Sequence, residues 1–211
     1  GQTDLVVSEL CLGTMTWGTQ NSAEDAFYQI EKSIDAGINF IDTAELYPVN
    51  PISGATQGES ERILGEWLNK SNCRDELIIA TKIAGNGPKH IRNGEGITKK
   101  SLFTAINASL NLLKTDYIDL YQLHWPNRGS YHFRQNWRFD PTSQDKNIVL
   151  DHMNEVLQAC DILKKEGKVR AFGLSNESAW GTAQWLRISE EKGLPRMDSI
   201  QNEYSLMCRI F

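Results

Sequence analysis

Residues 37–47 read GINFIDTAELY, an apolar run that ends at Asp42 and is followed five residues later by Tyr47. Short apolar runs of this kind predict buried β-strands. Three further runs end in polar side chains: LIIATK at Lys82, YIDLYQLHW at His124, and VRAFGLSN at Ser175 and Asn176. Parallel strands joined by helical crossovers place their carboxyl ends on one face, where the active sites of barrels form. We therefore expect these side chains to converge on one pocket.

The segments between these runs have the periodicity of amphipathic helices. Helices are predicted over 23–36, 58–70, 98–113, 148–165 and 178–192, and strands at 9–15, 38–42, 76–82, 117–124, 169–174 and 198–203. Ser22 and Thr98 suit helix N-caps, whereas Gly37 and Gly167 suit helix C-termini. About six βα units in this order imply a parallel sheet with right-handed crossovers. A doubly wound sheet and a closed barrel both fit that pattern.

Composition and charge argue against several other classes of protein. The chain has 211 residues, 40% of them hydrophobic, which is typical of one globular domain over 1–211. A net charge of −5 argues against a nucleic-acid partner. The sequence contains no apolar run long enough for a membrane span and no signal-peptide pattern at its start. Four scattered cysteines without a CxxC pair predict a reduced, cytoplasmic setting.

The connection from Asn127 to Asn147 is long for a βα loop and rich in aromatic and arginine residues. Loops of this length are usually functional or disordered, and the aromatic residues argue against disorder. Two interpretations stay open: a lid over the pocket, or a surface loop packed on its own side chains.

The polar residues at the strand ends have a coherent joint chemistry. Taken singly, a Lys–Asp pair, a tyrosine or a histidine is more often structural than catalytic. Together, Asp42 could hold Lys82 beside Tyr47, and the ammonium would then lower the phenol pKa from its reference value of about 10. His124 would be a neutral donor that orients a carbonyl group. This set suits delivery of a proton to an oxyanion, as in the reduction of a carbonyl by hydride.

The segments GINFIDTAELY, IIATKI, DLYQLHWP, GLSNES and SIQNEYS resemble the aldo-keto reductase superfamily, most closely its bacterial branch related to the potassium-channel β-subunits. The resemblance implies an α/β fold, a (β/α)8 TIM barrel that binds NADPH without a Rossmann domain. It also implies reduction of aldehydes or ketones, with Tyr47 as proton donor in a tetrad with Asp42, Lys82 and His124. The chain contains no GxGxxG motif, in agreement with this expectation.

The resemblance also assigns cofactor and pocket residues. Ser175, Asn176 and Gln201 match the residues that bind the nicotinamide carboxamide, with Asp42 beside the same cofactor. For Ser175 and Asn176, a helix N-cap is the structural alternative. Trp17 and Trp125 match pocket walls, and for both of them packing in the core is an equally good interpretation.

The match covers only about the first six βα units of the family barrel, so the domain reads as incomplete at its C-terminus. We expect a longer polypeptide or a disordered C-terminal third, with the barrel open between its first and sixth strands and NADPH binding weak or absent in the fragment. A cofactor-binding regulatory module with slow turnover is the alternative function. The four histidines show no HxH or HExxH spacing, so no metal site is expected. The substrate, beyond a small carbonyl compound, and the oligomeric state stay open.

Overall fold

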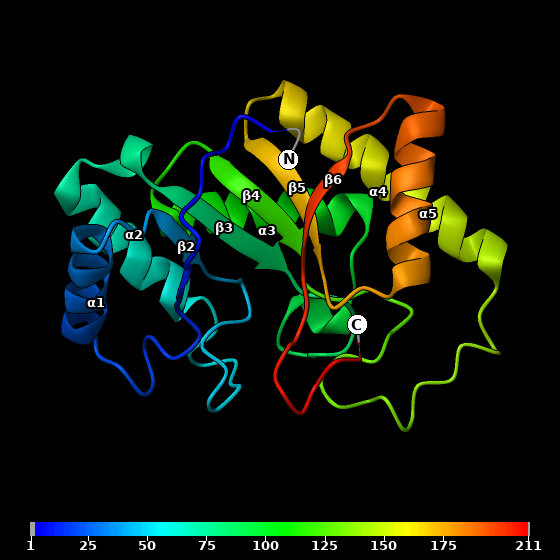
Figure 1. Ribbon diagram of the computed structural model, residues 1–211, viewed down its shortest axis with the longest axis horizontal. Helices are drawn as coiled ribbons and strands as arrows, with labels where there is room; N and C mark the ends of the chain where they lie inside the picture. Colours follow the sequence, from blue (N-terminus) through cyan, green and yellow to red (C-terminus); the bar gives the residue numbers. More distant parts are fainter. Residues whose placement is uncertain (1–2, 211) are drawn as a thin grey trace.

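Six parallel strands form one curled sheet in the computed structural model, which describes residues 3–210. The strands follow one another across the sheet in the order β1-β2-β3-β4-β5-β6 (Figure 1). In a doubly wound sheet the order reverses part-way, so this sequential order identifies the barrel alternative. The predicted fold is confirmed as a half-barrel made of about the first six βα units. The strands are β1 (Leu12–Gly13), β2 (Phe40–Asp42), β3 (Ile78–Ile83), β4 (Ile118–Leu123), β5 (Val169–Ser175) and β6 (Met197–Gln201).

In the described part of the chain, five α-helices cover the outer face of the sheet (Figure 1). They are α1 (Ala23–Asp35), α2 (Glu59–Ser71), α3 (Lys99–Leu113), α4 (Lys146–Lys165) and α5 (Ala179–Lys192). The predicted caps are confirmed, because the side chains of Ser22 and Thr98 accept hydrogen bonds from the first turns of α1 and α3. Helix α4 begins two residues before its predicted start at 148. The reason is Asp145, whose carboxylate caps the Asn147 and Ile148 amides.

Alternation along the strands separates an apolar outer face from a polar inner face. On β3, Ile79 and Ile83 belong to the main core between sheet and helices, whereas Ala80 packs with Leu120 and Ala171 inside the curve of the sheet. Every second residue therefore points inward, and near the carboxyl ends these inward positions are polar. The amino end of the curve is filled by apolar side chains, and the polar pocket lies at the opposite end.

The sheet has two outer strands, β1 and β6, and each pairs with one neighbour in the described part of the chain. None of the helices within residues 3–210 combines the length and the apolar character needed to cross a bilayer.

One buried carboxyl group carries a charge that the fold does not fully compensate. Glu61 on α2 is completely shielded from solvent, and its Oε1 accepts a hydrogen bond from the Thr81 hydroxyl at 2.6 Å. Its Oε2 has no hydrogen-bond partner among the described residues. Burial raises the pKa of Glu61 to about 7, because the hydrogen bond from Thr81 opposes the loss of hydration only in part.

We expect Glu61→Gln to stabilise the protein above neutral pH. The folded state binds this proton more tightly than the unfolded chain, so stability falls as the pH rises from about 4.5 to about 7. The variant lacks this loss and should exceed the wild type by on the order of 3 kcal/mol near pH 8, with little difference near pH 4. Urea denaturation at both pH values measures the difference. The control is Glu31→Gln, at an exposed position on α1, and identical pH profiles for Glu61→Gln and wild type would contradict the expectation.

Candidate active site

The Lys82 ammonium group is the centre of a polar cluster at the carboxyl end of the sheet. Its Nζ donates hydrogen bonds to Asp42 Oδ2 at 2.6 Å and to the Thr43 carbonyl oxygen at 2.8 Å, and it lies 3.3 Å from the Tyr47 hydroxyl. These three acceptors use all three donors of the ammonium. Because Tyr47 accepts from Lys82, its own O–H remains free to donate elsewhere.

Strand register explains why these side chains meet. Asp42 is the last residue of β2 and pairs in register with Ala80 of β3, two residues before Lys82, so both charged side chains lie on the inner face. Tyr47 lies beyond the strand, in the segment that connects β2 to α2, and its backbone amide donates to the Ala44 carbonyl oxygen at 3.0 Å. This turn brings the phenol back over the end of β3.

The protonation state of Tyr47 differs from the sequence expectation. Burial raises the pKa of the Tyr47 phenol, and the nearby Lys82 ammonium opposes this effect without outweighing it. The expected lowering of this pKa is therefore wrong for this structure. The Lys82 ammonium favours the phenolate, and the Asp42 carboxylate, paired with Lys82 at 2.6 Å, offsets part of that effect. The phenol keeps its proton at neutral pH.

His124 follows β4 directly and is held by its backbone. Its amide donates to the Ile83 carbonyl oxygen at 2.9 Å, and its carbonyl oxygen accepts from Asn176 Nδ2 at 2.9 Å. The ring meets the Tyr47 ring edge-on, with centroids 5.7 Å apart. Burial lowers the pKa of His124 well below its usual value, and the Lys82 ammonium adds to the effect. The imidazole is therefore neutral, as expected from the sequence.

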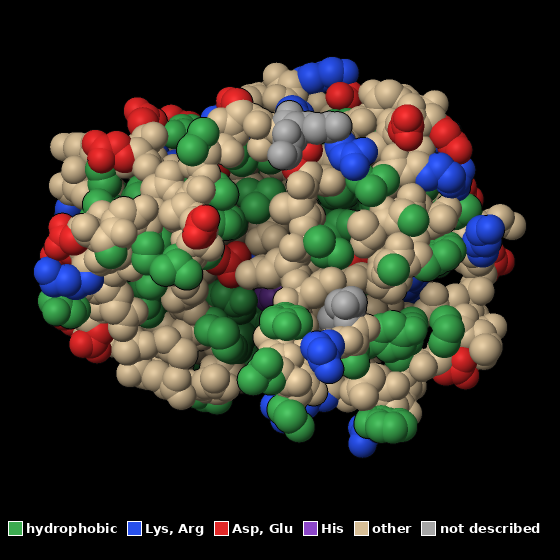
Figure 2. All heavy atoms as spheres, viewed as in Figure 1, with side chains coloured by type: hydrophobic (Ala, Val, Ile, Leu, Met, Phe, Trp, Pro, Cys, Tyr) green, Lys and Arg blue, Asp and Glu red, His purple; other side chains and the backbone are tan. Residues whose placement is uncertain are grey.

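These side chains border an open cavity of about 610 Å³. Figure 2 shows a hollow in this face of the molecule, bordered by green hydrophobic side chains and with a histidine side chain visible at its floor. The cavity is lined by Met15, Leu46, Tyr47, Val49, Asn50, Ile52, Lys82, His124, Phe133, Ser175, Asn176, Gln201, Asn202 and Glu203. Apolar groups thus surround a few convergent polar groups, the usual arrangement of small-molecule sites.

Ser175, Asn176 and Gln201, the three residues predicted to bind the nicotinamide carboxamide, all line this cavity. Ser175 Oγ donates to the Gln201 carbonyl oxygen at 3.0 Å, and Asn176 Nδ2 approaches Ser175 Oγ at 3.1 Å. Neither Ser175 nor Asn176 caps the following helix, because Ser178 does so through its side chain. The helix-cap alternative is therefore wrong. The Oδ1 atom of Asn176 has no hydrogen bond to any described residue and can accept one from an amide ligand.

Gln122 is a member of the cluster that sequence reasoning missed. Its Nε2 donates to Asp42 Oδ1 at 3.1 Å and lies 3.4 Å from Gln201 Oε1. Gln201 in turn donates to Asp42 Oδ2 at 3.3 Å. The signal in the sequence was its position two residues before His124, because side chains two residues apart in an extended chain point to the same face. These amides satisfy the carboxylate oxygens of Asp42 and hold it in place for Lys82.

The two tryptophans occupy different environments. Trp17 is fully buried in the main core, where its Nε1 donates to Gln29 Oε1 at 2.8 Å, and it does not line the cavity. Trp125 is also buried, and its ring lies beside the His124 ring with centroids 4.9 Å apart. Trp125 therefore packs against the His124 ring without lining the cavity, and Trp17 is a core residue.

The long connection after β4 combines features of both interpretations. The Tyr131 and Phe139 rings pack edge-on at 5.3 Å, as in a loop that packs on its own side chains. Phe133, in contrast, lines the cavity, with its ring centroid 6.4 Å from that of His124. Ser130 Oγ donates to the Asn176 carbonyl oxygen at 2.5 Å and ties the start of the loop to the end of β5.

Comparison with known proteins shows the family of this chain. The model of the aldo/keto reductase family matches residues 9–210. The chain belongs to the aldo/keto reductase family. Among its curated relatives, Protein tas of Escherichia coli is 42% identical over 213 residues, which cover 98% of this chain and 59% of that protein. Norsolorinic acid reductase stcV of Emericella nidulans is 35% identical over 218 residues, covering 97% of this chain and 49% of the reductase.

A third relative in the family, the uncharacterized oxidoreductase YrpG of Bacillus subtilis, is 30% identical over 216 residues, covering 99% of this chain and 58% of YrpG. The chain thus spans between 49% and 59% of the length of these aldo/keto reductase relatives.

Within residues 3–210, no group of three or more His, Cys, Asp or Glu side chains is arranged to hold a metal ion.

We expect the His124 ring to stay neutral at pH 6.5, where an ordinary imidazole is about half charged, since burial and the Lys82 ammonium both lower the pKa of His124. The ¹⁵N shifts of the ring nitrogens report the charge directly, and the His124→Asn variant assigns the signal. A histidine-containing peptide with a pKa near 6.5 is the reference. A titration of His124 that follows the peptide would show that the site is open to water or that the ammonium lies elsewhere.

Proposed function

We propose that the protein reduces the carbonyl group of a small aldehyde or ketone with NADPH, and that Tyr47 is the proton donor. The observation that carries the proposal is the Tyr47 hydroxyl on the wall of the cavity, 3.3 Å from the Lys82 ammonium and beside the neutral His124 ring. A protonated phenol whose oxygen already accepts a hydrogen bond has its proton available for a ligand in the cavity. General acid catalysis requires this arrangement.

Each member of the tetrad has a role that follows from its contacts. The neutral His124 ring can donate a hydrogen bond to the substrate carbonyl and orient it toward Tyr47. Tyr47 gives its proton to the carbonyl oxygen as the C=O π bond breaks and the new O–H bond forms. The phenolate left behind is stabilised by Lys82, which Asp42 holds in place at 2.6 Å. A proton from solvent then restores the phenol.

The proposed cofactor fits the chemistry of the adjoining wall. When bound, a reduced nicotinamide supplies the hydride that forms the new C–H bond. Its carboxamide has a donor and an acceptor, and Ser175, Asn176 and Gln201 offer hydroxyl and amide groups in the cavity that Tyr47 also lines. The free Oδ1 of Asn176 can accept from the carboxamide NH₂ group. NADPH in place of NADH follows from the family resemblance.

The names of the relatives support a reductive role. One is a norsolorinic acid reductase and another an oxidoreductase. The tetrad geometry is compatible both with turnover and with a cofactor-binding module that turns over slowly, so the measured rate of NADPH consumption has to distinguish the two functions.

We expect Tyr47→Phe to lower the rate of NADPH-dependent reduction of 4-nitrobenzaldehyde by about 10²- to 10⁴-fold, since it removes the proton donor. The loss of NADPH absorbance measures the rate. Tyr28→Phe, at a largely exposed position on α1, is the matched control and should retain full activity. Equal rates for Tyr47→Phe and wild type would exclude this role for Tyr47. A wild type that binds NADPH tightly without turnover would favour the regulatory module.

A second prediction concerns the carboxamide site. We expect Asn176→Gly to weaken NADPH binding by about 2- to 12-fold, the effect of losing one hydrogen bond. Glycine is chosen because Asn176 has a φ of 53°, a conformation that glycine adopts without strain. The control is Asn93→Gly, an exposed asparagine with a φ of 57°. Fluorescence titration of NADPH gives the dissociation constants. Equal affinities in the two variants would argue against a carboxamide contact at Asn176.

A further inference from the structure

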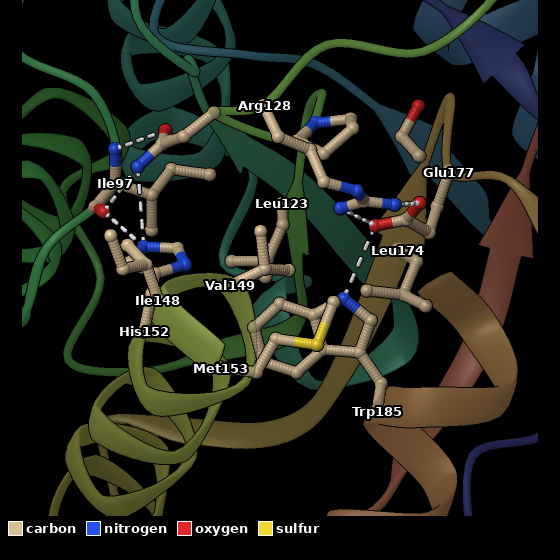
Figure 3. Close-up of a pocket in the computed structure, with 13 residues that line it drawn as sticks. Ile97, Leu123, Arg128, Ile148, Val149, His152, Met153, Leu174, Glu177 and Trp185 are labelled. Carbon is tan, nitrogen blue, oxygen red and sulfur yellow. Dashed lines mark hydrogen bonds and ion pairs between the residues drawn. The ribbon is translucent and has the colours of Figure 1, made fainter. Parts of the chain in front are cut away.

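A second cavity of about 310 Å³ lies between strands β4 and β5 and helices α4 and α5 (Figure 3). Its wall is mostly apolar and comes from two strands, two helices and the connections next to them. The strands contribute Leu123 and Leu174, α4 contributes Val149 and Met153, and α5 contributes Trp185. The volume falls at the lower end of the range of roughly 300–1,000 Å³ typical of small-molecule sites.

The charged groups at one end of this cavity are neutralised by each other. Arg128 forms an ion pair with Glu177, and both side chains are buried. The Trp185 Nε1 also donates to Glu177 Oε2, at 3.2 Å. A charged ligand would have to break this network and leave one of its members buried and unpaired, at a large cost. The cavity therefore selects a neutral molecule.

The opposite end presents one unused polar atom. His152 Nε2 lies 2.6 Å from the Ile97 carbonyl oxygen, a contact that requires a proton on this nitrogen. Asn127 Nδ2 is farther from it, at 3.2 Å, and donates to the same carbonyl oxygen at 2.7 Å. In the neutral ring, Nδ1 is then an acceptor. It has no hydrogen bond to any described residue, and in Figure 3 it lies on the side of the ring that faces the cavity.

We propose that this cavity binds a small phenol, a neutral aromatic ring with one hydroxyl group. The ring lies among the side chains of Leu123, Met153 and Trp185, and the hydroxyl donates a hydrogen bond to His152 Nδ1. The two cavities share only the lining residue Ser175. The phenol site requires neither the tetrad nor NADPH. An experiment can therefore disprove phenol binding without affecting the proposed reductase activity.

Calorimetric titration of the whole chain with phenol and with toluene tests the proposal. The two probes have similar size, but only phenol can donate to His152. We expect saturable binding of both, with phenol about 2- to 12-fold tighter. His152→Leu should remove this preference while leaving toluene binding in place. Absence of saturable phenol binding, or equal affinity of the wild type for the two probes, would overturn the proposal.

A cavity-filling variant locates the bound phenol. Val149→Phe should weaken the binding of both probes at least ~10-fold, since its ring occupies the space of the ligand. Glu155→Phe puts the same side chain on the exposed face of α4 and should leave binding unchanged. A crystal of the wild type soaked in 4-bromophenol gives an independent answer if Val149→Phe does not fold. Anomalous bromine density beside Met153 and Trp185 supports the site, whereas density only beside Tyr47 excludes it.

Discussion

The buried ion pair between Lys82 and Asp42 is the constraint on which the polar carboxyl end of the sheet depends. Lys82 is 1% exposed, and a charge so far from water persists only with close acceptors around it. Those acceptors come from β2 and from the turn that follows it. The Lys82 ammonium group therefore constrains both the register of β2 on β3 and the path of the chain from β2 to Tyr47. Gln122 of β4 and Gln201 of β6 donate hydrogen bonds to the Asp42 carboxylate, so the positions of these two strands also depend on the ion pair.

Burial and pairing act in opposite directions in this cluster. Removal of water raises the pKa of Tyr47 and lowers that of His124, so both side chains are neutral around pH 7. The ammonium favours the phenolate, but burial outweighs this effect on the pKa of Tyr47, and the Asp42 carboxylate adds to the rise. The cluster therefore keeps the proton on the Tyr47 phenol. It also stabilises the phenolate charge, which appears only after this proton has been transferred. This behaviour suits a general acid.

The same two strands, β4 and β5, build both cavities because their side chains alternate. Inward positions such as Gln122 and Ser175 contribute polar groups to the candidate active site, and outward positions such as Leu123 and Leu174 contribute apolar walls to the proposed phenol site. The Arg128–Glu177 pair closes one end of the outer cavity, and Ser130 attaches the long loop to Asn176 nearby. The segment after β4 thus organises the surroundings of both sites, with Phe133 reaching the inner one.

The sequence by itself determined the element order, the capped helices and the grouping of Asp42, Tyr47, Lys82 and His124, since periodicity, caps and strand parity are local properties. Only the tertiary structure decided what depends on contacts between distant segments. Burial set the direction of the Tyr47 pKa, against the expectation from Lys82 alone. The core enclosed Trp17, and Ser178 instead of Ser175 or Asn176 capped α5. Desolvation and cavity shape arise from packing among segments far apart in the chain, which no local pattern records.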